Sequence, residues 1–200
     1  MKISKTLLIA GLSPLLFTGC ATQQATYVEA SGPRTLATVG QINIQDFASA
    51  ADKMVNSMIL EVINGGKLKA ASGQQSVLAI SRVENKTGQH FDTDELTKKI
   101  RVRLNQTGKI VTTTTVKYGG AEDPMARQAQ VEQSLTGNAT ATRSPDYYLS
   151  GKIIDKMTRV GDLRQMAYVF QLSLTSTDGL AIWEGEETIV KQGTRSAVGF

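Results

Sequence analysis

The fold of this chain is decided by residues 165–190, which read QMAYVFQLSLTSTDGLAIWEGEETIV. Apolar side chains occupy every second position of residues 165–177, and this alternation is typical of a strand with one buried face. Asp178 and Gly179 follow, and both residue types tolerate the positive φ angles of a two-residue hairpin turn. We therefore predict that residues 180–190 return as an antiparallel strand.

The chain before this hairpin alternates between helical and strand patterns. From Asp46 onward, apolar side chains recur three and four positions apart, as on one face of a helix that Gly65 and Gly66 end. The other predicted elements are a possible short strand at residues 39–44, a covered strand at 76–83, a helix opened by a capping box of Asp92 and Glu95, a strand at 110–116, a helix at 124–135 and a strand at 147–157.

This order of elements predicts the fold class. We expect an α/β domain in which a mixed β-sheet is flanked by helices, in the order α-β-α-β-α-β-β-β, ending in an antiparallel meander. In the helix that Asp92 opens, Leu96, Ile100 and Leu104 are predicted to face inward. The opposite face, which we interpret as solvated, carries Lys98, Lys99, Arg101 and Arg103.

The N-terminal end has the pattern of an export signal. Two lysines precede an apolar run at residues 7–17, which is too short to span a bilayer as a helix. Cys20 follows the small residue Gly19, and this junction resembles the lipobox of bacterial lipoproteins. We expect residues 1–19 to be removed as a signal peptide and Cys20 to carry the lipid.

Cys20 is the only cysteine of the 200 residues, so the chain offers neither an intramolecular disulfide nor a thiolate metal site. Ala21 follows it. In the lipoprotein sorting rule that this end resembles, Asp at that position favours the inner membrane, so we expect the outer membrane, facing the periplasm. Residues 20–38 predict a lipidated flexible tether with a mean reach of roughly 25 Å, and residues 39–200 predict a single globular domain.

The charge balance gives little support to a nucleic-acid role. Loss of the two lysines of the signal lowers the formal net charge from +4 to +2. The sequence also has no basic block interleaved with aromatic residues. We expect no nucleic-acid partner.

The sequence offers few groups suited to catalysis or cofactor binding. His90, the only histidine, lies in a polar loop, where we interpret it as exposed and idle. The triplet Lys-Thr-Gly at residues 86–88 matches one motif of penicillin-interacting serine enzymes, but the sequence contains no Ser-x-x-Lys, so we interpret it as a turn. The sequence has no Walker loop and no G-x-G-x-x-G, so nucleotide binding through these motifs is excluded. Taken together, these observations lead us to expect no enzyme, no cofactor and no small-molecule substrate.

Three carboxylates close together could suggest a cation site: Asp92, Asp94 and Glu95. They stand at a predicted helix start, however, where the helix dipole and capping favour carboxylates. We therefore expect no metal site.

Three stretches together resemble one family, the LpoB-type penicillin-binding protein activators. They are residues 51–59 in the first helix, residues 77–87 with residues 104–109 around the second helix, and residues 147–151 with residues 178–185 in the meander. The resemblance covers residues 46–192.

The resemblance implies an outer-membrane lipoprotein, itself without catalysis, held to the membrane by its lipid. It implies a class A penicillin-binding protein as partner, a peptidoglycan glycosyltransferase and transpeptidase that the lipoprotein binds and stimulates. The alternative is an envelope assembly or secretion role. The curli-secretion lipoproteins have a similar α/β domain and also resemble this chain around the Asn-x-Thr motif at residues 85–87. No contact residue is carried over from either family.

Overall fold

The computed structural model describes residues 27–29, 32, 38–70, 74–113, 115–116, 120–121, 123–137 and 143–194. The predicted signal peptide, Cys20 and most of the predicted tether lie outside the described residues. The helices are α1 (Ile44–Met58), the π-helix η1 (Ile59–Ile63), α2 (Asp94–Gln106) and α3 (Pro124–Leu135). The strands are β1 (Ser76–Ile80), β2 (Glu84–Asn85), β3 (Ile110–Thr112), β4 (Thr115–Val116), β5 (Gly120–Ala121), β6 (Tyr147–Val160), β7 (Leu163–Ser176) and β8 (Ala181–Thr194).

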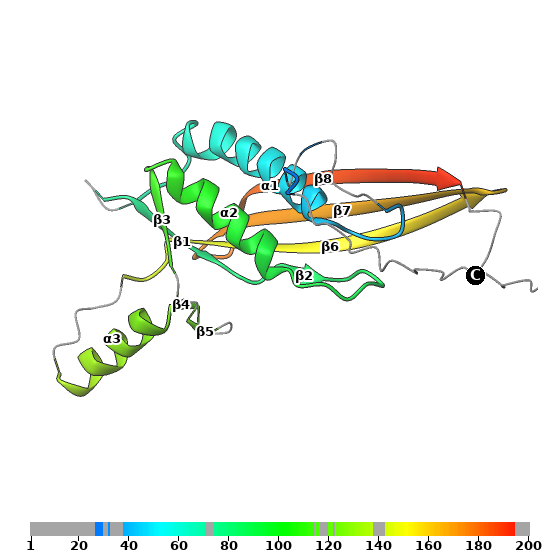
Figure 1. The fold of residues 1–200 in the computed structure, drawn as a ribbon. Helices are drawn as coiled ribbons and strands as arrows, with labels where there is room; N and C mark the ends of the chain where they lie inside the picture. The colour runs from blue at the N-terminus through cyan, green and yellow to red at the C-terminus, as the bar shows by residue number, and fades with distance from the viewer. Residues whose placement is uncertain are drawn as a thin grey trace, which may run out of the picture.

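One mixed sheet forms the centre of the domain. It has six strands in the order β3-β1-β6-β7-β8, with β2 paired to β6. The pairs β1–β3, β1–β6 and β2–β6 are parallel, whereas β6, β7 and β8 form an antiparallel meander. The predicted mixed sheet and closing meander are therefore confirmed. Helices α1 and α2 lie side by side on one face of the sheet, and none of the described helices covers the opposite face of the meander (Figure 1).

Helix α1 begins at Ile44, so the short strand predicted at residues 39–44 is wrong. Asn43 is the N-cap: its side-chain oxygen accepts from the Asp46 amide at 3.1 Å, and the Asp46 carboxylate accepts from the Asn43 amide at 2.8 Å. This capping box satisfies two amides that would otherwise lack helical partners. The predicted apolar face is confirmed as buried: Phe47, Ala51, Met54, Val55, Met58 and Val62.

Two predicted strands are shorter than expected. All five residues of β1 are buried, as expected of a covered strand, but the strand ends at Ile80. Glu84 and Asn85, which no predicted strand includes, pair with β6 as β2. Residues 110–116 divide between β3, which joins the main sheet, and β4, which pairs with β5. β-Branched residues favour strand in both parts, but only the available neighbours decide the pairing.

Helix α2 begins at Asp94 with Thr93 as N-cap, so the predicted capping box of Asp92 and Glu95 is wrong. Asp92 stands one residue before the cap, and its carboxylate accepts from the Asp94 amide at 2.8 Å. The predicted inward side chains of α2 are confirmed as buried: Leu96, Ile100 and Leu104.

The β7–β8 turn differs from the predicted two-residue type. Gly179 has a φ of +86°, but no non-glycine residue in the described part of the chain has positive φ, so Asp178 does not adopt the predicted conformation. The Gly179 amide donates to the Ser176 carbonyl at 3.0 Å, and the Ser176 amide donates to the Leu180 carbonyl at 2.9 Å. This is the three-residue loop that closes on a left-handed glycine.

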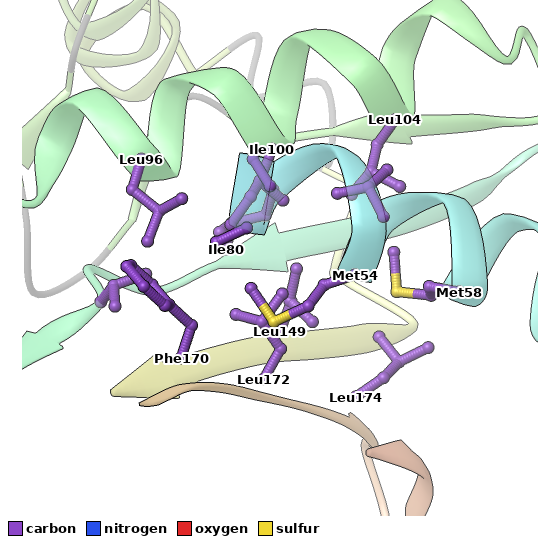
Figure 2. Packing of buried hydrophobic residues seen from close by; sticks show 14 of the residues in the cluster. Met54, Met58, Ile80, Leu96, Ile100, Leu104, Leu149, Phe170, Leu172 and Leu174 are labelled. Atoms are coloured by element: carbon purple, nitrogen blue, oxygen red, sulfur yellow. The ribbon is translucent and has the colours of Figure 1, made fainter. Parts of the chain in front are cut away.

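The core lies between the helices and the covered face of the sheet. Met54 of α1 and Ile100 of α2 point toward Leu149 of β6, and Met58 of α1 lies beside Leu174 of β7 (Figure 2). Every second residue of β7 from Met166 to Leu174 is buried, as its alternation predicts. The side chains at the other positions of β7 therefore face away from the helices.

Candidate functional site

A polar cleft lies where β1 ends and α2 begins. It has a volume of about 1220 Å³ and is lined by the end of β1, by β2, by the loop that follows β2 and by the first turns of α2. Ser150 and Gly151 of β6 complete the lining. The cleft therefore joins one stretch of the sequence, within residues 80–101, to two residues of β6.

The loop after β2 is held by one asparagine. The Asn85 side-chain oxygen accepts from the Thr87 amide at 2.9 Å and from the Thr87 hydroxyl at 2.8 Å, and its amide group donates to the Gln89 carbonyl at 2.7 Å. The Lys-Thr-Gly triplet at residues 86–88 thus forms a bend around Asn85. His90 is exposed and lines the cleft beside this bend.

The carboxylates at the start of α2 are engaged by protein donors. Arg82 binds Asp94 through two hydrogen bonds of 2.8 and 2.7 Å, and the hydrogen bond to Asp94 raises the pKa of Arg82 above its ordinary value. Glu95 pairs with Lys99 at 3.5 Å. Across the described ranges, no group of three His, Cys, Asp or Glu side chains is placed to hold a metal ion. The arrangement is therefore that of a helix start.

Arg101 is the cleft residue that the sequence interpretation placed wrongly. It was predicted on the solvated face of α2, but it is only 5 % exposed and lines the cleft together with the buried Thr97. Asp94, Thr97 and Arg101 stand at positions i, i+3 and i+7 of the helix, which places them on one face. This spacing is a signal in the sequence that could have identified the face.

A second cluster joins the segment before α1 to the meander. Gln89 donates to the Gly40 carbonyl and to the Tyr168 hydroxyl, both at 2.8 Å, and accepts from the Ile42 amide at 3.1 Å. Tyr168 is fully buried, and its burial raises the pKa of its hydroxyl above the ordinary value. One side chain thus connects the cleft loop, the N-terminal segment and the sheet.

A buried ion pair adds to these contacts between the segment before α1 and the meander, which we call the junction. Lys191 of β8 binds the carboxylate of Asp46, and both side chains are nearly buried, with exposures of 12 % and 7 %. Lys191 also donates to the Gln41 carbonyl at 2.9 Å and lies 5.7 Å from the centroid of the Tyr168 ring. Removing either charge would leave the other buried and uncompensated.

The open face of the meander is the face away from α1 and α2. A shallow polar hollow of about 600 Å³ lies over its β6–β8 strands. On it Gln171 donates to Glu186 at 2.6 Å and Ser173 donates to Glu184 at 3.1 Å. Tyr148, 48 % exposed, lies on the same face. The open face therefore carries acidic, amide and aromatic groups and the basic side chain of Lys152.

These features define a small α/β domain with one helix-covered sheet face, one open sheet face and a polar cleft. The sequence matches the family described as the peptidoglycan-synthase activator LpoB over residues 46–189, and the chain belongs to that family. The match runs from the first turn of α1 into β8. It confirms the resemblance drawn from the sequence.

Solved structures show partial similarity to this chain. The LpoB C-terminal domain from Salmonella enterica is 20 % identical, with a TM-score of 0.43, over 72 % of this chain and 98 % of that one. The NMR structure of E. coli LpoB is 19 % identical, with a TM-score of 0.40, over 96 % of this chain and 94 % of that one. Lipoprotein GNA1162 from Neisseria meningitidis is 11 % identical, with a TM-score of 0.38, over 60 % of this chain and 86 % of that one. None of the curated proteins matches the sequence.

The predicted lipid attachment residue, Cys20, lies outside the described residues. In the part of the chain that the structure describes, no helix combines the length and the apolar character needed to cross a membrane.

Proposed function

We propose that this protein is an outer-membrane lipoprotein that binds a bifunctional class A peptidoglycan synthase from the periplasmic side and stimulates it. The observation that supports this proposal is the match to the synthase activator family, which spans residues 46–189 and so includes the cleft and most of the meander. The protein itself performs no catalysis in this proposal.

Activation requires only a preference for one conformation of the synthase. A ligand shifts an equilibrium by its differential affinity for the two states, and allosteric couplings of about 1–3 kcal/mol are typical. The open face suits such a contact because no described helix covers it and its three paired strands are each 14 residues long (Figure 1). Its carboxylates, Glu184 and Glu186, would meet basic groups of the synthase.

The lipid anchor is the second part of the proposal. Lipid on Cys20 would hold the domain by the predicted tether of residues 20–38, which has a mean reach of roughly 25 Å. The contact between the domain and the synthase would then form close to the outer membrane. Replacement of Cys20 by serine should abolish incorporation of radiolabelled palmitate, and continued incorporation in this variant would contradict attachment at Cys20.

The activator role is tested by the rate at which class A synthases of the host polymerise glycan strands from lipid-linked precursor. We expect a several-fold acceleration on addition of the mature protein. An unchanged rate with every class A synthase of the host would contradict the proposal.

A pair of charge reversals locates the contact. Glu186→Arg on the open face should weaken stimulation, whereas Glu95→Arg on the exposed side of α2 should leave it unchanged. Equal loss in both variants, or in neither, would place the contact away from the open face.

A further inference from the structure

The β6–β7 end of the meander exposes apolar side chains. Met157 is 49 % exposed, Val160 73 % and Leu163 38 %, and the last two face each other across the turn. These strands extend beyond the helices, so no described helix covers this end (Figure 1). We call residues 156–164 the meander tip.

Cations surround these apolar side chains. Lys156 and Arg159 are exposed, and Arg164 stands directly opposite Arg159 on the neighbouring strand. Like charges that face each other across strands repel unless an anion lies near them. Asp155 and Asp162 lie on the same hairpin, so the anions of the tip are fewer than its cations.

The chain that leads to the predicted lipid reaches the domain at this same end. The Val39 side chain lies over Gly193, where an added Cβ would come within 2.7 Å of it. Gly40 lies against the Arg164 guanidinium in the same way, with a corresponding distance of 3.2 Å. Gly193 and Arg164 are paired residues of β8 and β7, so the segment before α1 contacts the meander next to the tip.

We propose that the meander tip docks on the surface of the membrane that holds the lipid, with its aliphatic side chains between the headgroups and its cations on anionic phosphates. This rests on the proposed lipidation of Cys20. An apolar patch with adjacent lysines and arginines suits an anionic lipid surface. A soluble partner is disfavoured because the tip lies at the anchored end of the domain, where the bilayer is the nearest surface.

Weak affinity is sufficient for this docking. A short flexible linker holds an attached domain at an effective concentration in the millimolar range. An association constant of about 10⁴ M⁻¹, like that of a single acyl chain for a membrane, would then keep most molecules docked. Docking would also orient the domain, because the tip and the β7–β8 turn lie at opposite ends of β7. The open face would consequently stand at an angle to the bilayer and remain accessible.

The test uses the mature lipidated protein in vesicles, with an environment-sensitive fluorophore on a single engineered cysteine. The lipidated Cys20 has no free thiol, so Asp162→Cys provides the only reactive one. The matched control is Asp178→Cys, because each aspartate lies in an exposed turn beside a left-handed glycine. The vesicles contain phosphatidylethanolamine with phosphatidylglycerol, or phosphatidylcholine alone, and spin-labelled lipids serve as quenchers.

We expect strong quenching at position 162 in anionic vesicles, several-fold less in neutral vesicles, and none at position 178. Val160→Ser with Leu163→Ser should reduce quenching at position 162 at least fivefold, while circular dichroism confirms an unchanged fold. Equal quenching at the two positions, or none at position 162, would overturn the proposal. Flotation of the protein with the vesicles reports lipidation separately, and the glycan polymerisation rate reports synthase activation separately.

Discussion

The two faces of the meander use the same strands for different purposes. On the covered face, Phe170 and Leu172 are at most 2 % exposed and pack under the helices. On the open face, the alternating residues Gln171 and Ser173 bond to glutamates that remain at the surface. Substitutions on the first face should act on stability, and substitutions on the second should act on recognition.

The largest expected effect is on the covered face. Phe170→Ala would remove a ring that is 1 % exposed and packs edge-on against Phe47 at 6.3 Å between centroids. The cavity and the lost burial should lower the free energy of unfolding by about 3–5 kcal/mol. Val169→Ala, on the open face, is the control and should cost less than about 1 kcal/mol in the same urea titration. Similar losses in both variants would mean that the two faces are not distinct.

The second effect concerns the junction. Lys191→Met would leave the Asp46 carboxylate buried without its cation, so we expect a loss of about 3 kcal/mol in the free energy of unfolding. The control is Lys53→Met, because Lys53 forms an ion pair with Glu187 in which its own side chain is 63 % exposed. That exposed pair should contribute less than about 1 kcal/mol. A larger loss from Lys53→Met would contradict the assignment of the junction as the stronger contact.

A smaller effect should appear at alkaline pH. Burial raises the pKa of Tyr168 above its unfolded value of 10.0. The contribution of this group to stability is therefore complete below about pH 10 and is lost as the pH rises through the folded pKa. Urea titrations at pH 8 and pH 11 should show a drop for the wild type that is reduced in Tyr168→Phe. An equal drop in both proteins would exclude Tyr168 as the source.

The smallest stability effect is expected on the open face. Glu186→Arg should change the free energy of unfolding by no more than about 0.5 kcal/mol, since exposed substitutions rarely do more. Its effect should appear instead as weaker stimulation of a class A synthase. A stability loss above about 1 kcal/mol would mean that the functional result for this variant reports misfolding.

Most of the fold could be predicted because its patterns are local. The alternation of β7 and the spacing of α1 each depend on neighbours a few residues apart, and both predictions are confirmed by burial. The meander followed for the same reason, since Asp178 and Gly179 end one alternating run and begin another. Even so, the turn takes three residues because only Gly179 adopts a positive φ.

The candidate site could be predicted far less well. Its cleft joins a stretch within residues 80–101 to Ser150 and Gly151 of β6, which lie far from that stretch in the sequence. Arg101 lies among other charged residues in the sequence, as expected of a solvated helix face, yet it is buried and lines the cleft together with the loop after β2. The three residues that the Gln89 side chain binds are 47 to 79 positions away in the sequence, so no local pattern could identify them.

The sequence by itself determined the order of the main helices and strands, the buried apolar side chains of α1 and α2 and the closing meander, because local periodicity and turn chemistry are sufficient for these. The tertiary structure alone decided where residues 110–116 divide, which carboxylate Lys191 binds and which cation of α2 lines the cleft. These outcomes depend on contacts between segments far apart in the chain, and such contacts exist only once the sheet and helices have packed.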